Sequence, residues 1–277
     1  TGKPMYFVEM DNLEYGLSEQ YVGVLFGEVV NGKLYMYSWE CNMIFIQDLQ
    51  TGELEVERGN ENYPVSDKNM YGSSITDGNI IYFLPCGTTM EVLRYDTVTK
   101  EKESIKISEE PNDYIPVLEG EQLYLLPVYA SDFFWSIDRR TREVKKFPTN
   151  YRRNISGLEK EERKALFVYG VLANGSFWRG SWFGPYIQKF NFDKKMFEYI
   201  QIADWRKPIA GLAFDGTYFW GVSFYGSTVF QWNAEENRIV QTIEIEYMES
   251  QDDKQLFENI WFCNGRLWLV PLEGTQV

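Results

Sequence analysis

The sequence contains no histidine among its 277 residues. This absence excludes Ser-His-Asp and Cys-His nucleophilic catalysis, proton transfer through imidazole, and metal centres that depend on histidine ligands. The glycine-rich loop that binds phosphates in P-loop proteins is also missing. Carboxylates, tyrosine, lysine and arginine remain for catalysis, but with 41 acidic residues the presence of two carboxylates indicates nothing. We therefore expect no cofactor and no metal-binding motif, although calcium held by backbone carbonyl oxygens would need no motif.

Basic residues are scarce: 27 lysines and arginines stand against 41 acidic residues, for a net charge of -14. Nucleic acids and anionic membranes are bound through basic surface, so we expect neither as a partner. No run of eighteen apolar residues and no basic-then-apolar leader occurs. We therefore expect no membrane insertion and no signal peptide in this chain, and a cytoplasmic or a cell-surface location both stay open.

Cysteine is nearly absent too, with three residues and no metal-type spacing. An odd count is not a disulfide framework, so we expect buried thiols at Cys41, Cys86 and Cys263. One bridge stays open as an alternative, because the repeats described below place these residues in neighbouring copies.

Aromatic residues, in contrast, are abundant, at 17% of the chain. The stretch DGTYFWGVSFYGSTVFQWN, residues 215–233, holds seven of them and contains two turns, Asp215-Gly216 and Tyr225-Gly226-Ser227. Aromatic and β-branched runs with glycine at the bends predict a β-hairpin and not a helix.

The same pattern recurs along the chain. A turn that ends in glycine is followed by an apolar run six times, with spacings of 46, 42, 55, 41 and 49 residues; these turns begin at Asn31, Asp77, Glu119, Asn174, Asp215 and Asn264. A second turn follows the first five of them after 17 to 19 residues, at Asp48, Asp96, Asp138, Asn191 and Asn233. Each unit therefore reads as four short strands, and a period in the forties built this way is typical of a propeller blade.

With these turns, of the forms DG-x-[LIF]-Y and D-x-x-T-G-E, the chain resembles the six-bladed bacterial members of the β-propeller superfamily. The resemblance implies an all-β fold, a six-bladed β-propeller of four-stranded antiparallel blades, which protects its sheet edges by radial repetition. The signatures of kelch, WD and YWTD repeats are absent, and SSITDGNIIY, residues 73–82, comes nearest to the sialidase Asp-box but lacks its tryptophan. The resemblance therefore implies architecture and no activity.

We expect one propeller domain over residues 1–277. Its blades span about 21–60, 69–108, 113–148, 166–203, 208–247 and 258–277. The last of these holds only the first half of a blade. We expect the N-terminal run KPMYFVEM, residues 3–10, to complete it as an additional strand and so close the ring.

The loops between the second and third strands of the blades carry large aromatic residues. In a propeller these loops meet at one end, and exposed aromatic side chains are unfavourable in loops unless they bind something. The candidate ligand-binding residues from these loops are Trp39, Tyr129, Trp182, Phe183, Tyr186, Phe224 and Tyr225.

The connections from one blade to the next reach the same end and add positive charge. Two of them place aromatic and basic residues together, which suits a carboxylate-bearing sugar, a peptide terminus or an acidic protein segment. Their candidate ligand-binding residues are Tyr151, Arg152, Arg153, Trp205 and Arg206. Residues 156–166, SGLEKEERKAL, have a serine cap with glutamate three positions later and predict a short helix.

Packing is the competing interpretation of every one of these features. Aromatic residues at one repeat position within the strands should pack between blades; they are Tyr35, Tyr82, Tyr124, Trp178, Phe219, Trp232 and Trp268. The loop aromatic residues could equally pack on a neighbouring blade, and the arginines could be solvated or paired with acids.

The function that we favour from the sequence is a non-catalytic, ligand-binding propeller that recognises carbohydrate or peptide at its aromatic-rich end. A second hypothesis is a histidine-independent carbohydrate-active enzyme, either a carboxylate-pair or a sialidase-like glycosidase, with Arg152 or Arg206 binding an acidic sugar. A third is a structural or protein-interaction module of a larger protein. The catalytic residues of an enzyme stay unknown in all of these.

Overall fold

The computed structural model describes residues 24–39, 41–67, 70–86, 88–107, 112–129, 131–149, 167–245 and 255–271. These residues form strands, turns and irregular connections, and none of them is helical. The chain divides into two compact units, Thr1–Pro111 and Asn112–Val277, and each is described by itself. The predicted strand at residues 3–10 and the predicted helix at 156–166 lie outside the described residues, and the single domain stays a prediction.

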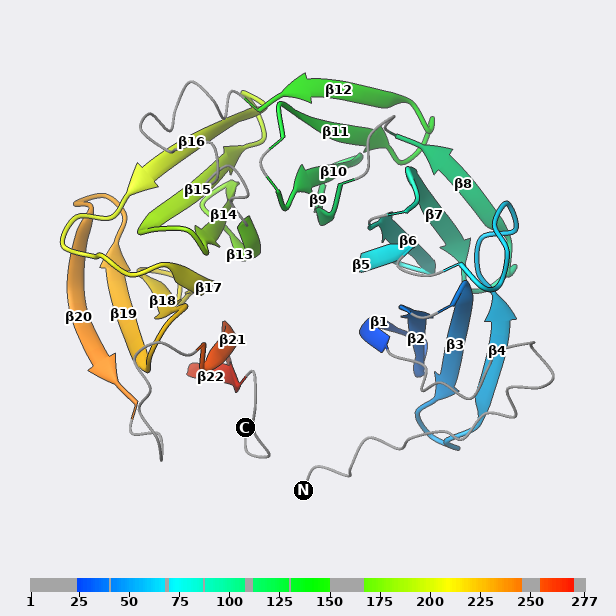
Figure 1. Cartoon of the computed structure of the whole chain (residues 1–277), viewed down its shortest axis with the longest axis horizontal. Helices are drawn as coiled ribbons and strands as arrows, with labels where there is room; N and C mark the ends of the chain where they lie inside the picture. The colour runs from blue at the N-terminus through cyan, green and yellow to red at the C-terminus, as the bar shows by residue number, and fades with distance from the viewer. Residues whose placement is uncertain are drawn as a thin grey trace. The chain divides into compact units, whose positions relative to one another are not determined.

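The first unit contains two four-stranded antiparallel sheets, in which each strand pairs with the next one along the chain (Figure 1). Their first strands, β1 and β5, contact each other. Sheet 1 consists of β1 (Val24–Val30), β2 (Lys33–Ser38), β3 (Met43–Asp48) and β4 (Leu54–Arg58). Sheet 2 consists of β5 (Tyr71–Asp77), β6 (Ile80–Pro85), β7 (Glu91–Asp96) and β8 (Lys102–Lys106).

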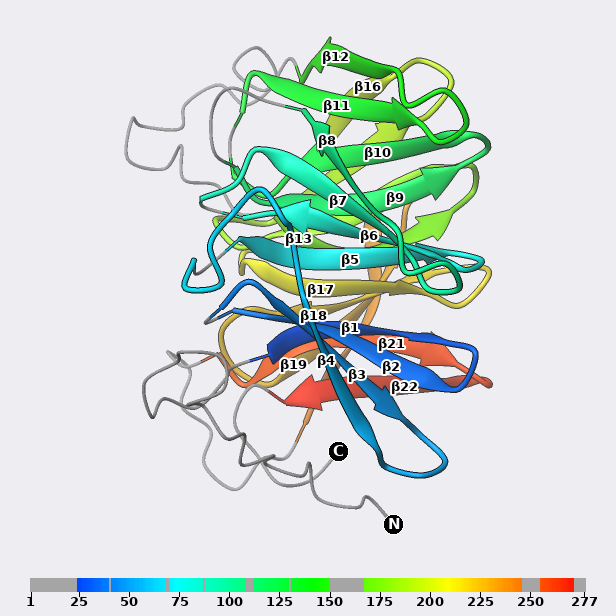
Figure 2. The same ribbon diagram turned by 90° about the vertical axis from the view of Figure 1, so that its right-hand side faces the viewer.

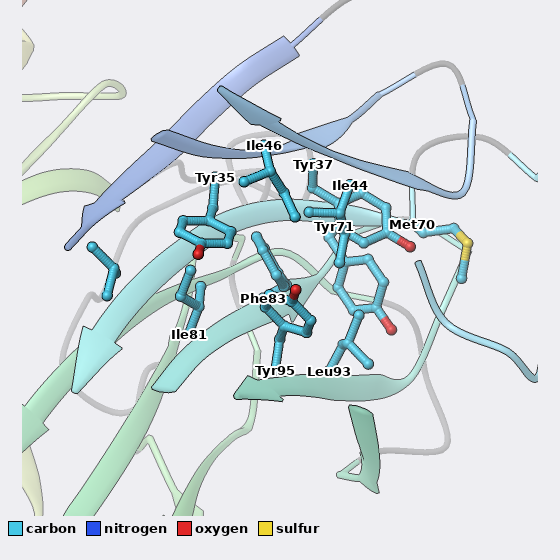
Figure 3. Close-up of a cluster of buried hydrophobic side chains, with 11 residues drawn as sticks. Tyr35, Tyr37, Ile44, Ile46, Met70, Tyr71, Ile81, Phe83, Leu93 and Tyr95 are labelled. Carbon is cyan, nitrogen blue, oxygen red and sulfur yellow. The ribbon is translucent and has the colours of Figure 1, made fainter. Parts of the chain in front are cut away.

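Aromatic rings fill the space between sheets 1 and 2. Tyr37 of β2 meets Tyr71 of β5 and Phe83 of β6 edge to face, with ring centroids 4.6 and 5.2 Å apart (Figure 3). Aliphatic side chains from both sheets, such as Ile44 and Ile81, complete the cluster and are fully buried. This packing buries one face of each sheet, which a lone four-stranded sheet could not do.

The second unit contains three more four-stranded sheets and one two-stranded sheet, all antiparallel and in chain order (Figure 1). Sheet 3 consists of β9 (Tyr114–Glu119), β10 (Gln122–Pro127), β11 (Phe133–Asp138) and β12 (Val144–Pro148). Sheet 4 consists of β13 (Phe167–Ala173), β14 (Ser176–Ser181), β15 (Tyr186–Asn191) and β16 (Met196–Gln201). Sheet 5 consists of β17 (Ile209–Phe214), β18 (Phe219–Ser223), β19 (Thr228–Asn233) and β20 (Arg238–Glu244). Sheet 6 consists of β21 (Phe257–Cys263) and β22 (Arg266–Pro271), which Figure 2 shows in orange and red. The predicted four-stranded repeat is thus confirmed in five sheets.

Strand β17 contacts β13 on one side and β21 on the other, so sheets 4, 5 and 6 are neighbours through their first strands. Gly211 allows the closest approach: a Cβ atom there would lie 2.3 Å from the side-chain oxygen and 2.9 Å from the Cα of Asn259. The predicted packing aromatic residues fill the rest, with Trp178, Phe219 and Trp232 all buried in one cluster between sheets 4 and 5.

Trp268 departs from this pattern. The repeat predicts it between blades, but its side chain is 44% exposed on β22. The physical reason is that sheet 6 has two strands in the described part of the chain, so β22 forms an edge that pairs only with β21. Trp261, opposite Trp268 in the register, is 56% exposed.

The cysteines differ in part from the expectation. Cys41 and Cys86 are buried, as predicted, whereas Cys263 is exposed on sheet 6. All three are thiols, so the bridge that stayed open is not formed. Among the described residues, no helix is long and apolar enough to cross a membrane.

The second turn of the repeat has a recurring hydrogen-bond pattern in four of its five copies. One Oδ1 atom accepts the backbone N–H groups two and three residues later: Asp48 from Gln50 and Thr51, both at 2.9 Å. The same side-chain cap occurs at Asp96, Asp138 and Asn233. This explains why aspartate or asparagine recurs here, because both supply the acceptor.

These caps predict acid sensitivity. Backbone N–H groups lower the pKa of Asp48, Asp96 and Asp138. A carboxyl group with a depressed folded-state pKa adds stability above its unfolded pKa, and that stability is lost as pH falls through the folded pKa. We expect the variant that combines Asp48→Asn, Asp96→Asn and Asp138→Asn to lose less unfolding free energy than wild type when the pH is lowered from about 7 to about 3. Urea titrations at each pH measure this free energy. Asparagine keeps the acceptor and removes the titration.

The matched control changes net charge equally at exposed glutamates, with Glu101→Gln, Glu121→Gln and Glu235→Gln combined. It should show the full pH dependence of the wild type. Equal pH dependence in all three proteins would contradict the role given to the caps.

Candidate functional site

The candidate site lies at the ends of sheets 4 and 5 where the second strand connects to the third. We call this end of each sheet its loop end. The connection from the fourth strand to the next sheet leaves from the same end. In sheet 4 the connection runs over residues 182–185, and in sheet 5 over residues 224–227. Four of the predicted ligand-binding aromatic residues belong to these segments, namely Trp182, Phe183, Phe224 and Tyr225, and a fifth, Tyr186, begins β15 directly after the first segment.

Trp182 joins the two loops. Its ring lies 4.8 Å from that of Phe224, centroid to centroid, and Phe224 in turn meets Tyr225 edge to face at 4.7 Å. The indole Nε1 of Trp182 donates a hydrogen bond to the carbonyl oxygen of Ala210 in β17, at 3.4 Å. Trp182 and Phe224 are half-buried and Tyr225 is 41% exposed. We call these three residues the aromatic cluster.

A second group of rings extends from the same loop. Phe183 stacks on Tyr186 with centroids 5.6 Å apart and meets buried Phe167 edge to face at 5.3 Å. Gly184 makes the stacking feasible, because a Cβ atom there would lie 2.9 Å from the Tyr186 ring. The structure brings Phe183 and Tyr186 together at the loop end of sheet 4, where both are half-buried, and their part in ligand binding stays a prediction.

Trp205 is a core residue. It is 6% exposed and packs on Phe230 with centroids 4.4 Å apart, in the cluster between sheets 4 and 5. Its indole nitrogen is buried and has no hydrogen-bond partner among the residues that the structure describes. Its neighbour Arg206 is exposed and donates to the Trp205 carbonyl oxygen at 3.2 Å. Trp205 therefore supports the loop end from within the core, because burying the large apolar surface of an indole is favourable.

The other predicted residues are distributed elsewhere. Tyr129 is 43% exposed at the loop end of sheet 3. Trp39 is half-buried in the first unit, with its ring 3.8 Å from the position of a Cβ atom on Gly72. Tyr151, Arg152 and Arg153 lie outside the described residues, so their part in the site stays a prediction.

Sequence reasoning missed a polar pair on the first strands of sheets 4 and 6. The Tyr169 hydroxyl of β13 donates a 2.6 Å hydrogen bond to the Glu258 carboxylate of β21. Both residues lie where the register of the first strand shifts against the second, and Ala210 holds the equivalent place in β17. A β-bulge redirects side chains, and it is not visible as a sequence motif. Burial, followed by the Glu258 carboxylate, raises the pKa of Tyr169.

The sequence also gave no sign of Arg179. This arginine of β14 is 1% exposed, and neutral oxygens accept its hydrogen bonds: the Gln188 side chain at 2.6 Å and the carbonyls of Phe167 at 3.1 Å and Pro127 at 2.8 Å. Burial lowers the pKa of its guanidinium to about 9. Because Pro127 ends β10 and Phe167 begins β13, the side chain fastens the loop end of sheet 3 to that of sheet 4.

In the first unit the corresponding end is filled by a polar network. Asn42 donates to the carbonyl oxygens of Asn60 at 2.7 Å and Tyr63 at 2.8 Å, and accepts from the Tyr37 hydroxyl. Asn60 donates to the Tyr71 hydroxyl at 2.9 Å. Burial raises the pKa of both Tyr37 and Tyr71. These side chains are occupied in holding the connection between sheets, which makes the network structural.

Comparison with known proteins identifies the fold. No family model matches the sequence, and no curated protein sequence is significantly similar to it. The structure is similar to virginiamycin B lyase from Staphylococcus aureus, with a TM-score of 0.67 and 12% identity over 92% of this chain and 80% of the lyase. It is also similar to Sqt1 from Saccharomyces cerevisiae, with a TM-score of 0.63 and 11% identity over 92% of this chain and 72% of Sqt1. A third similar structure is BamB from Moraxella catarrhalis, with a TM-score of 0.50 and 14% identity over 88% of this chain and 66% of BamB.

These neighbours are β-propellers, and the fold of this chain is that of a β-propeller. Identities this low concern architecture alone, and the neighbours have diverse roles. The resemblance and the all-β class predicted from the turns are therefore confirmed, whereas the function has to be argued from the site itself.

The position of Arg179 predicts a large and specific stability effect. Arg179→Met should lower the unfolding free energy by about 3 kcal/mol, because it leaves buried oxygen acceptors without their donors. The control is Arg238→Met, since Arg238 is exposed and paired with Glu236, and it should change stability by less than about 0.5 kcal/mol. Urea unfolding monitored by circular dichroism measures both. Equal effects of the two substitutions would show that Arg179 does not fasten the loop ends.

Proposed function

We propose that the loop end of sheets 4 and 5 is a ligand-binding surface, non-catalytic, which recognises carbohydrate or an extended peptide. The observation that supports this most is the contact between the two loops: Trp182 of one packs on Phe224 of the other, with Tyr225 attached and partly exposed. Large aromatic residues at a surface supply most of the binding energy in protein interfaces.

The arrangement of these rings favours binding over mere packing. Trp182 is held by the tilted ring of Phe224 and by a hydrogen bond from its indole nitrogen to the Ala210 carbonyl oxygen. Fixing a side chain before the ligand arrives lowers the entropy cost of association. Half-burial leaves part of each ring for a ligand, and a contiguous group of partly exposed rings marks an interaction surface better than single exposed residues do. Tyr129, Arg206, Phe183 and Tyr186 are the proposed flanking contacts.

The remaining candidates have separate places in the proposal. Tyr151, Arg152 and Arg153 belong to the connection that precedes sheet 4, and we propose them as further contacts from the sequence alone. Trp39 belongs to the first unit and is kept as a contact of that unit's own loop end. Trp205 shapes the surface indirectly from the core.

The catalytic activity of one structural neighbour is not carried over to this chain. The virginiamycin B lyase was crystallised as a catalytically inactive variant with a histidine replaced by alanine, bound to quinupristin. This chain has no histidine at all. Any catalytic activity here would therefore need different side chains.

One observation favours a second candidate function, that of a sialidase-like glycosidase. The Tyr169 hydroxyl donates to the Glu258 carboxylate at 2.6 Å, and a tyrosine with a carboxylate base is the nucleophile pair that such a reaction needs. The raised pKa of Tyr169 keeps its proton on the phenol near neutral pH, so attack would require transfer of that proton to Glu258. This requirement makes binding the better supported function.

The glycosidase candidate predicts hydrolysis of aryl glycosides, aryl sialosides included, that falls at least about a hundredfold in Tyr169→Phe. Release of the aryl alcohol, followed by absorbance, measures it. Absence of hydrolysis by the wild type would rule the candidate out, and equal rates in wild type and variant would assign any activity to other residues.

The binding function predicts that Trp182→Ala and Tyr225→Ala each lose at least about tenfold in affinity for the ligands found. A glycan array and a peptide array, probed with the full chain and both variants, measure this. The control is Trp268→Ala, which removes an exposed tryptophan from sheet 6 and should bind as wild type does.

Folding has to be separated from binding in this test. Tyr225 is exposed, so its replacement should leave the melting temperature nearly unchanged, whereas Trp182→Ala should cost about 1 kcal/mol of stability. Arrays on which neither variant differs from wild type would contradict the proposed function.

A further inference from the structure

We infer that the ligand of this surface is an extended peptide with a basic side chain, whose ammonium or guanidinium group is received by the Glu258 carboxylate beside the aromatic cluster. The inference rests on the proposed function and names its ligand class. It reverses the charge that the aromatic-arginine pairs in the sequence indicate.

Strand β17 connects the aromatic cluster to the segment of β21 that carries Glu258. Trp182 donates its hydrogen bond to Ala210, the bulge residue of β17. The next residue, Gly211, approaches Asn259 so closely that a Cβ atom would lie 2.9 Å from the Cα of Asn259, the neighbour of Glu258. Ala210 therefore occupies the bulge between those of Tyr169 and Glu258, and its small side chain is buried.

Phe224 provides an independent link between the cluster and β21. It packs against the hydrophobic cluster that contains Phe257, the residue before Glu258. In addition, Gly226, next to Tyr225, forms a bridge with Gln255 just ahead of β21. The aromatic cluster and Glu258 are thus joined from both sides, through sheet 4 and through the loop of sheet 5.

Glu258 is oriented without being neutralised. Its partner is the neutral Tyr169 phenol, at 2.6 Å, and no lysine or arginine among the described residues forms an ion pair with it. A phenol occupies one oxygen and leaves the other for a ligand. A cation there gains from the carboxylate and from the faces of neighbouring aromatic rings.

The net charge of the chain has the same sign as the Glu258 carboxylate. A net charge of -14 attracts basic ligands and repels acidic ones at a distance. Arg206, the described basic residue of the aromatic-arginine pairs, donates to the backbone carbonyl oxygen of Trp205 at 3.2 Å. Its exposed position suits solvent or a rim contact better than a buried carboxylate of a ligand.

A peptide is favoured over a sugar by the state of the loop hydroxyl groups. Sugar recognition needs several polar side chains aimed at ring hydroxyls. The Oγ atoms of Ser181 and Ser223 are buried and accept backbone N–H groups of their own loops, at 3.2 and 3.3 Å. Ser227 donates to Glu244 at 3.2 Å. Apart from the tyrosine hydroxyls and Arg206 at the rim, aromatic rings and one carboxylate remain, a combination that fits an apolar segment with a basic side chain.

The experiment is an array of random decapeptides, acetylated at the amino end and amidated at the carboxyl end, probed with the full 277-residue chain. We expect captured peptides to be enriched in lysine or arginine at one position. Replacing that residue by norleucine should weaken binding by about tenfold, measured by fluorescence anisotropy. The norleucine peptide changes only the ligand, so the test does not depend on how a protein variant folds.

Protein variants assign the effect to Glu258. Glu258→Gln should weaken binding of the basic peptide about tenfold and leave the norleucine peptide unaffected, whereas Glu258→Asp, which keeps the charge, should retain part of the preference. The control is Glu235→Gln, which changes net charge equally at the turn between β19 and β20 and should bind as wild type does.

The outcomes separate this inference from the proposed function. Binding that depends on Trp182 but shows no preference for basic peptides, or that is confined to glycans, would overturn the inference and leave the proposed function standing. A basic preference that survives Glu258→Gln would overturn the role of Glu258. If the chain shows no binding that depends on Trp182, to peptides or to glycans, both the inference and the proposed function are overturned.

Discussion

Neighbouring sheets in this protein bury their facing sides against each other, and aromatic rings fill the space between them. In the first unit, Tyr37, Tyr71 and Phe83 interlock between sheets 1 and 2. In the second, Trp178, Phe219 and Trp232 do so between sheets 4 and 5. Rings placed edge to face combine a large buried area with a fixed geometry. This packing sets how close adjacent sheets lie, and it therefore also sets where their loop ends meet.

The loop end of sheets 4 and 5 is a consequence of that constraint. Two loops that belong to different sheets would otherwise have no reason to stay together. Trp205 and Phe230 beneath them, and Trp182 and Phe224 within them, continue the aromatic packing out to the surface. Arg179 extends the same connection to sheet 3 through carbonyl oxygens. Aromatic packing and hydrogen bonds thus hold the loop end of sheets 4 and 5 to the sheets beneath it.

The sequence predicts the fold well because its signals are local. Turns such as Asn31-Gly32 and Asn174-Gly175 have positive φ at both residues, which asparagine followed by glycine tolerates best. Capping by Asp48 and its equivalents needs only a side chain two or three residues from its partner. These rules repeat with the period of the chain, so the strands between them follow.

The site is less predictable because its contacts join distant residues. Tyr169 and Glu258 are 89 positions apart and meet only because β17 brings their strands together. The place of Trp205 in the core, and of Trp268 at an exposed edge, depends on which neighbour covers each of them, and a repeat pattern treats all copies alike. The residue types of the loop end could be predicted, whereas their partners and the sign of the charge beside them could not.

Trp182 and Phe224 hold two loops from different sheets together as one surface. A double-mutant cycle tests this, in which urea unfolding gives the free energies of wild type, Trp182→Ala, Phe224→Ala and the double variant. Direct packing predicts a coupling of about 0.5 to 1.5 kcal/mol, so that the double variant loses less stability than the two single variants together. Additive losses would mean that the two loops are independent, and would contradict the account.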